Sequence, residues 1–302
     1  MNVMVLSKKY STILDEVYME NACTAVLESD RALASEGANA NEIIIPRLKM
    51  DGLANYSRND GYVKGDVALT WQTAKFNYER GRMFVVDAMD NEESQKIAFG
   101  SLASQFIKGK AVPELDAFRF ATLASCKGIS RKAGTLESGE AAAAALREAL
   151  NALDTAQVPS EERILFITPM LKGMIDDMDT SKSRAVMAGF EKIVCVPQSR
   201  FYTKIKLLDG VSEGEKEGGY VKAADGEDIN FMIVHKPAVI QFTKTAVPKI
   251  IPPANNPDAD SWKYGYRSYG LCEVYENKAA GIYCHAKGTA VEEEEPEEND
   301  EQ

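Results

Sequence analysis

One stretch of this sequence, residues 42–80, has the pattern of a long β-hairpin. A strand-like segment at 42–50 is followed by a stretch rich in Asp, Asn and Gly, and a second segment then alternates apolar and polar positions from Val67 to Thr73. Pro46 favours an edge or irregular strand, because proline lacks the N–H that a sheet ladder needs. A two-stranded ribbon of this length is marginal in water unless it packs against something. The fold must therefore give this hairpin a partner.

The hairpin is also rich in aromatic residues, which suggest where that partner comes from. Aromatic side chains on a projecting ribbon favour burial against another chain. We therefore expect them to form an intersubunit contact. The alternative is that the ribbon folds back on its own domain. The residues concerned are Tyr56, Tyr62, Trp71, Phe76 and Tyr78.

After the hairpin, the chain alternates helical and strand patterns. Asp90 and Glu93 have the spacing of a capping box, and an apolar stripe continues from there to about residue 126. Pro113 interrupts the stripe, so we expect a kink or a break at that point. Ala- and Leu-rich residues predict another helix at 138–156. The next four segments are predicted as a strand, two helical stretches and a strand: 164–167, 169–178, 183–190 and 193–196.

The C-terminal third is predicted to be mostly β-structure. Residues 209–228 are mainly Gly, Glu, Lys and Asp, which is typical of a flexible surface loop. Four apolar segments follow and are predicted as strands: 229–234, 238–243, 264–275 and 281–285.

The negative charge of the chain is concentrated at one end. The formal net charge is −11, and the eight acidic residues after Ala290 supply −8 of it, which leaves −3 for the rest. The body therefore lacks the basic face of a sequence-specific DNA-binding domain. The segment 288–302 is too charged and too poor in apolar residues to fold, and is predicted to be a disordered acidic tail.

No sequence feature indicates secretion, a membrane or a disulfide framework. The longest apolar runs are far short of the about 18–20 residues that span a bilayer, and the N-terminus lacks the order of a signal peptide. The five cysteines are scattered and none has metal-ligand spacing. We expect unpaired thiols packed as small apolar residues.

Catalytic motifs are also lacking. Neither G-x-x-x-x-G-K-[ST] nor G-x-G-x-x-G occurs in the chain. The only two histidines are His235 and His285, and Cys284 beside the latter would point to the opposite face of a strand. Cys272, Cys284 and His285 match no zinc-site spacing. The sequence therefore predicts no catalytic, cofactor or metal site.

Several separate stretches resemble the major capsid proteins of tailed bacteriophages. They occur in the order of that family, and the resemblance spans about residues 8–287. It implies an α+β chain with the Hong Kong 97 fold, which has an N-terminal arm, an extended E-loop, a peripheral (P) domain with a long spine helix, and an axial (A) domain. The stretches are 45–53, 56–62, 65–71, 87–93 and 274–283.

The resemblance implies a division of the chain into these parts. Part of 229–287 could belong to either the P domain or the A domain, and this assignment is left open. The implied boundaries are 1–41 for the arm, 42–80 for the E-loop, 81–136 and 229–287 for the P domain with its spine helix at 90–126, 137–228 for the A domain and 288–302 for the tail.

The implied function is structural. Many copies would assemble as pentamers and hexamers into an icosahedral shell around double-stranded DNA, in the cytoplasm of a bacterial host, and become part of the virion. Only about 41 residues precede the E-loop, so we expect a separate scaffolding protein, together with a portal. Packaged DNA would be contacted weakly and without sequence preference, since the body carries little charge. Lys49 and Lys64 lie in the loop, but no motif marks a crosslinking partner.

Two other functions remain open from the sequence. One is an encapsulin-like nanocompartment, which shares the fold and encloses protein cargo. The other, from a different class, is a cytosolic α/β enzyme with an unrecognised site.

Overall fold

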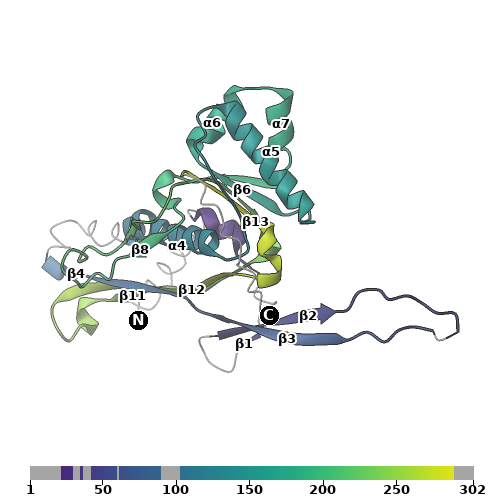
Figure 1. Ribbon diagram of the computed structural model, residues 1–302. Coiled ribbons are helices and arrows are strands. Elements are labelled where there is room, and N and C mark those ends of the chain that lie inside the picture. The colour runs from purple at the N-terminus through teal and green to yellow at the C-terminus, as the bar shows by residue number, and fades with distance from the viewer. Residues whose placement is uncertain (1–21, 30–34, 37–41, 60, 90–102, 289–302) are drawn as a thin grey trace, which may run out of the picture.

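The computed structural model describes residues 22–29, 35–36, 42–59, 61–89 and 103–288 (Figure 1). The predicted capping box at Asp90, the first third of the predicted 90–126 helix, most of the arm and the acidic tail after Gly288 lie outside these residues. The described chain forms a projecting β-ribbon, a long three-stranded sheet with a helix on it, and a five-stranded sheet covered by further helices.

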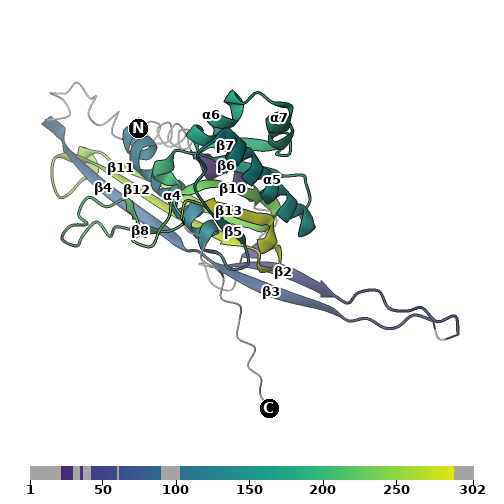
Figure 2. The ribbon, with the colours of Figure 1, turned by 45° about the horizontal axis from the view of Figure 1, so that its top comes forward.

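The ribbon is built from two nine-residue strands. Strand β2 (Glu42–Met50) pairs antiparallel with β3 (Val67–Lys75), and the short β1 (Ser35–Glu36) adds to the outer side of β2. The predicted hairpin is therefore present, and Figure 2 shows how far it extends from the rest of the chain. At its root, the ribbon packs in a small apolar cluster that includes Ile43 and Ala74.

A sheet of three long antiparallel strands continues from the ribbon. Its order is β11 (Val239–Ile251), β12 (Ser261–Val274) and β4 (Tyr78–Asp87). The spine helix packs on one face of this sheet through aromatic contacts. Phe106 lies edge-to-face with Phe84 of β4, and their ring centroids are 4.8 Å apart.

The spine helix passes Pro113 without a break. Residues 103–106 are α-helical, Ile107–Ala111 form a π-helical turn, and α4 (Val112–Ser125) continues from there. Proline removes one helical hydrogen bond, and its ring clashes with the carbonyl four residues earlier. The wider π turn directly before it makes room, with the Val112 N–H bonded to the Ile107 carbonyl. The expected break is therefore absent, and the helix changes type directly before Pro113.

The second sheet has five strands and is mostly buried. Helices α5 (Gly139–Thr155), α6 (Pro169–Asp177) and α7 (Ser181–Met187) cover one face, and α4 lies near the other (Figure 1). The predicted helix at 138–156 is confirmed, with the Ser138 hydroxyl accepting the Ala141 N–H as its cap. In order, the strands are β5 (Ser130–Ala133), β13 (Ile282–Ala286), β10 (Ile229–His235), β6 (Arg163–Ile167) and β7 (Lys192–Cys195).

The C-terminal third crosses between the two sheets. Strands β10 and β13 belong to the five-stranded sheet, whereas β11 and β12 belong to the long sheet. The short 3₁₀ helices η5 (Lys236–Ala238) and η7 (Glu276–Gly281) make the two crossings. Gly281 is needed at the second, because a Cβ there would lie 3.1 Å from Ala238 Cβ and 3.2 Å from His235 Cβ.

The expected surface loop at 209–228 contains one short strand, Tyr220–Lys222, and is otherwise mostly turns, bends and irregular structure. Strands β8 (Ile205–Leu207) and β9 (Tyr220–Lys222) pair antiparallel, and the tip between them is closed by its own side chains. The Asp209 carboxylate, for example, accepts the backbone N–H groups of Val211 and Ser212. Short polar side chains that bond to nearby backbone can order a segment that composition alone marks as a loop.

The described part of the chain contains no helix that is both long and apolar enough to cross a membrane. All five cysteines are described, and none is in a disulfide.

Candidate assembly interface

The ribbon has one apolar face that its own chain does not cover. Residues directly opposite each other in an antiparallel pair point to the same side, and Leu48 pairs with Leu69 while Met50 pairs with Val67. Trp71 follows on the same side, because side chains of a strand alternate with a period of two. Each of these five side chains has between 54% and 67% of its surface exposed. We call Leu48, Met50, Val67, Leu69 and Trp71 the apolar ribbon face.

The opposite side of the same ribbon has a different character. Lys49 pairs with Ala68 there, and both are exposed. Closer to the root, Gln72 and Ala74 on this side are buried against the body. The ribbon thus uses its less apolar side to attach to its own chain and leaves the more apolar side in solvent. In a soluble chain, an exposed contiguous apolar surface of this kind marks an interaction site.

The tip of the ribbon is held in a defined turn. The backbone groups of Ser57 and Gly61 bond to each other in both directions, with N–O distances of 3.2 and 2.8 Å. Gly61 has a φ of 78°, which glycine adopts without the steric cost that a side chain imposes. Beside the turn, Tyr56 and Tyr62 meet edge-to-face with their ring centroids 4.9 Å apart, and both remain largely exposed.

Two of the five predicted contact residues pack inside their own chain. Phe76 stacks on Tyr269 with ring centroids 4.7 Å apart. Tyr78 is only 4% exposed, its ring lies 4.9 Å from that of Phe118, and its hydroxyl lies 3.3 Å from the Glu114 carboxylate. The expectation that these two lack an intrachain partner is therefore wrong. They lie where the ribbon turns into β4, at the edge of the body.

Tyr56, Tyr62 and Trp71 are exposed, and their role in a contact between subunits stays a prediction. Counting aromatic residues missed the four aliphatic members of the apolar ribbon face. The alternation of Val67 and Leu69 was the signal that could have found them, once paired in register with the first strand.

The β8–β9 hairpin lies over the long sheet and is held there by arginines of β4. Arg80 Nη2 donates to the Leu208 carbonyl at 2.7 Å, while Arg80 Nε pairs with the Glu114 carboxylate of α4 at 2.6 Å. Arg82 Nη2 donates to the Lys216 carbonyl at 3.0 Å. Gly210 beside it has a φ of 74°, a backbone conformation that favours glycine. This hairpin is fixed by its own chain.

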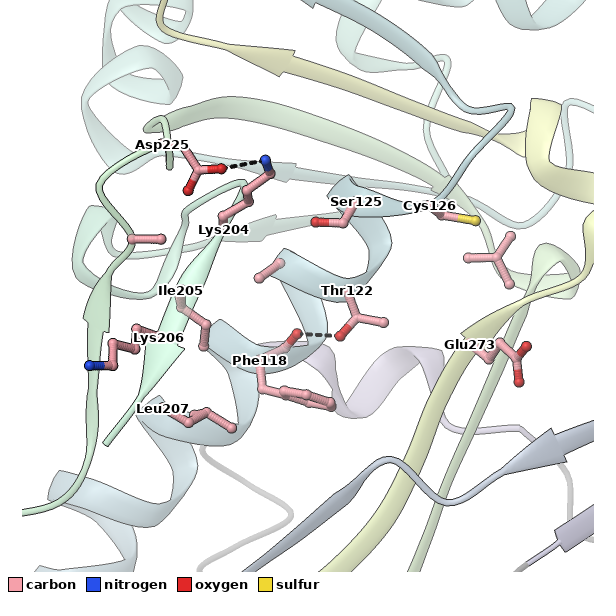
Figure 3. Close-up of a pocket in the computed structure, with 13 residues that line it drawn as sticks. Phe118, Thr122, Ser125, Cys126, Lys204, Ile205, Lys206, Leu207, Asp225 and Glu273 are labelled. Atoms are coloured by element: carbon pink, nitrogen blue, oxygen red, sulfur yellow. Dashed lines mark hydrogen bonds and ion pairs between the residues drawn. The ribbon is translucent and has the colours of Figure 1, made fainter. Parts of the chain in front are cut away.

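The groove next to this hairpin contains no reactive arrangement (Figure 3). It has a volume of about 760 Å³ and lies between α4, β8 and the end of β12. Lys204 Nζ bonds to the Asp225 carboxylate at 2.6 Å, and the Thr122 hydroxyl donates to the Phe118 carbonyl of its own helix at 2.8 Å. The polar groups at this groove are thus engaged with neighbouring groups, and its floor is apolar.

His285 and two of the cysteines, Cys272 and Cys284, are buried. His285 is 2% exposed, and burial, with Lys132 adding to it, lowers its pKa to about 4. Its Nδ1 lies 3.0 Å from Asn230 Nδ2. Burial raises the thiol pKa of Cys272 and of Cys284 to about 12. Among the described residues, no three His, Cys, Asp or Glu side chains come together as a metal site would require.

No protein-family model matches the chain, and no curated protein matches its sequence. Solved structures do match across most of its length. A structure of Microbacterium phage Oxtober96 has a TM-score of 0.59 at 12% identity, and the match covers 89% of this chain and 91% of the other. The mature capsid of bacteriophage PhiM1 has a TM-score of 0.57 at 13% identity, with 83% of each chain covered.

A further match comes from a different kind of particle. The virus-like particle from Pyrococcus furiosus has a TM-score of 0.57 at 11% identity, and the match covers 93% of this chain and 99% of the other. At such low identity these likenesses concern the path of the chain. Each of the three matches covers more than four fifths of both chains. The chain therefore has the Hong Kong 97-type fold found in tailed-phage capsids.

Proposed function

We propose that the chain is a structural shell protein and not an enzyme. Many copies assemble as pentamers and hexamers into an icosahedral capsid around double-stranded DNA, formed in the cytoplasm of a bacterial host. The observation that carries the proposal is the apolar ribbon face, which projects from the body with no cover from its own chain. A second copy is the simplest partner, because every copy carries both the ribbon and the surface that receives it.

The energetics favour such a contact. Fully burying one large apolar side chain contributes about 1.5–3 kcal/mol, and the apolar ribbon face offers five of them. A ribbon that meets a different surface on its neighbour makes a head-to-tail contact. Repeated contacts of this kind close into rings when the rotation between copies is right. Pentamers and hexamers are rings of this type.

The division into arm, E-loop, P domain and A domain belongs to the same proposal. The ribbon corresponds to the E-loop, the long sheet with α4 to the P domain, and the five-stranded sheet with α5, α6 and α7 to most of the A domain. In this assignment β10 and β13 fall in the A domain, although they lie in the segment 229–287.

An encapsulin-like compartment is the second candidate. It is favoured by the match to the Pyrococcus furiosus particle, which extends over nearly the whole of both chains. The two candidates differ in what the shell encloses. A phage capsid holds double-stranded DNA and requires a portal and a scaffolding protein, whereas a compartment encloses protein.

Electron microscopy of the purified chain tests the proposal. Expressed alone, the chain is expected to give capsomers, tubes or irregular shells, and uniform closed shells are expected once a scaffolding protein is supplied. Uniform shells from the single gene, filled with protein and lacking nucleic acid, would favour the compartment. A chain that stays monomeric at high concentration in both conditions would contradict both candidates.

A deletion gives a second test within the same preparation. Removing residues 51–66 takes away the ribbon tip and leaves the root cluster of Ile43 and Ala74 intact. The shortened chain should remain folded and soluble but form no closed shells. Shells of normal size from this variant would show that the ribbon tip is not an assembly element.

A further inference from the structure

The segment 22–29 lies at a junction of three parts of the molecule. It contains the 3₁₀ helix η1 (Cys23–Leu27) and follows directly on residues 1–21. Leu27 is fully buried in the core between the two sheets. Ser29 attaches to β11, since its N–H donates to the Gln241 carbonyl at 2.9 Å and its hydroxyl to the Val239 carbonyl at 3.1 Å. We call residues 22–29 the clasp segment.

One buried carboxylate joins the clasp segment to the end of the five-stranded sheet. Asp116 of α4 has no exposed surface, and it accepts the N–H groups of Cys23 and Thr24 at 3.0 and 3.1 Å and the Thr24 hydroxyl at 2.7 Å. On its other side it pairs with Arg200 Nη1 at 3.2 Å. Arg200 ends the 3₁₀ helix η4 (Gln198–Arg200), which follows β7. A buried charge is costly in free energy unless several partners bond to it, so the loss of any one of these bonds is destabilising.

A buried guanidinium joins the clasp segment to the long sheet. The Arg119 side chain is 3% exposed, and it donates to the Thr24 hydroxyl at 3.1 Å and to the Thr243 hydroxyl of β11 at 3.0 Å. It also pairs with the Glu28 carboxylate at 3.3 Å. Glu28 in turn accepts the Thr243 N–H at 2.6 Å. Thr24 is thus bonded to both Asp116 and Arg119 of α4.

These polar contacts differ in kind from the apolar core that the two sheets share. That core includes Phe166 and Met232 from one sheet and Val239 and Cys272 from the other. Apolar packing has little directionality, so it tolerates small rotations of one sheet on the other. Hydrogen bonds to buried charges require particular distances and angles. The clasp segment is therefore bonded directly to β11 of the long sheet, and through Asp116 and Arg200 to the residues that follow β7 of the five-stranded sheet.

We propose that the clasp segment fixes the angle between the long sheet and the five-stranded sheet, a role that we call the lock. We further propose that its hydrogen bonds to Asp116 and Arg119 thereby set the curvature with which subunits assemble. The second of these statements rests on the proposed shell function. The first concerns the single subunit and is independent of it.

The test uses Thr24→Val in the full chain. Valine keeps the shape of threonine but removes the hydroxyl that bonds to both Asp116 and Arg119. Hydrogen exchange of unassembled subunits should quicken about tenfold in two places, residues 198–203 and residues 239–243, since each loses part of its anchoring through the clasp. The matched control is Thr122→Val on α4, whose hydroxyl bonds only to its own helix. The control should leave both regions unchanged.

Glu28→Gln provides a second variant that retains the shape at the lock and removes the charge facing Arg119. It should quicken exchange at 239–243 more than at 198–203, because Glu28 bonds to the β11 side. Unchanged exchange at both regions in both variants would overturn the lock. So would a uniform rise that includes the distant helix α5, since general destabilisation has no preferred location.

Particle size then tests the link to curvature. Shells from Thr24→Val should show a broader distribution of diameters than shells from the wild type or from Thr122→Val. If the diameters are equally distributed while hydrogen exchange still changes locally, the proposed effect on curvature would be overturned and the lock would stand. A wild-type chain that forms no shells would contradict the proposed function, and the exchange result would still decide the lock.

Discussion

Two hairpins extend from this molecule, and they are held in opposite ways. The β8–β9 hairpin is polar, and its backbone carbonyls bond to Arg80 and Arg82 of the same chain. The β2–β3 ribbon is attached only at its root, and its more apolar face is exposed. A hairpin that satisfies its polar groups internally needs no partner, whereas an uncovered apolar face is stabilised only when something buries it. The difference indicates which of the two serves assembly.

The largest effect is expected from a charge on the apolar ribbon face. Leu69→Asp places a carboxylate at a position that must be dehydrated when the face is buried, so closed shells should be lost. Ala68→Asp, on the neighbouring position but the opposite side, is the control and should assemble with little change. Electron microscopy and sedimentation measure both. Equal loss of shells in the two variants would mean that the two faces do not differ in function.

Mutations that release the β8–β9 hairpin should lower the stability of the single subunit. Arg80→Ala removes the bond to Leu208 and leaves the mostly buried Glu114 without its guanidinium, which should cost about 2–3 kcal/mol in the free energy of unfolding. Arg267→Ala, which breaks an exposed ion pair with Glu79, should cost less than about 1 kcal/mol. Denaturant unfolding measures both. A loss of shells without a loss of stability in Arg80→Ala would assign this hairpin to assembly as well.

The free energy of unfolding should also depend on pH, because His285 is buried in the core. His285 has a pKa of about 4 in the folded chain against 6.5 for the ordinary side chain, so the unfolded chain binds more protons between these values. The free energy of unfolding should fall by on the order of 2 kcal/mol as the pH drops from 6.5 to about 4, and this contribution should be constant above 6.5. His285→Gln should flatten the profile.

The control for this titration is His235→Gln. Burial lowers the pKa of His235 in the same direction, but this residue is 9% exposed against 2% for His285. Its replacement should therefore flatten the profile less. Profiles of urea unfolding that do not change in either variant would remove the histidines from the pH response of the body.

The smallest effect is expected from the acidic tail. Truncation after Gly288 removes all eight of its acidic residues and no residue of the described sheets. Shell yield and subunit stability should change by less than their experimental error if the tail is passive. Salt-dependent aggregation of the truncated chain would indicate instead that the tail keeps subunits apart by charge repulsion.

The sequence pattern correctly predicted the helices and strands whose formation depends mainly on neighbouring residues. The helix at 138–156 followed from its Ala- and Leu-rich stripe, and the strand at 164–167 followed from its apolar run. The predictions that failed depended on distant residues. Composition marked 209–228 as a loop, but arginines of β4, more than a hundred residues away, hold part of it as a hairpin. Tyr78 was assigned to a contact between chains, but Phe118 and Glu114 of the spine helix cover it.

The strands of the ribbon end at Lys75, and residues 78–80 already belong to β4. The sequence by itself determined that a long amphipathic hairpin begins at residue 42, because the period of two and the turn residues of a strand pair are local properties. It also determined that the chain lacks the phosphate-binding glycine motifs and the spaced ligands of a zinc site. Only the tertiary structure decided which side of that hairpin is covered and which faces solvent. Coverage depends on what the fold brings against each face, and burying Gln72 and Ala74 on one side leaves Leu69 and Trp71 exposed on the other. The same is true of Asp116 and Arg119, whose spacing on one helix gave no sign of the clasp segment that they bind.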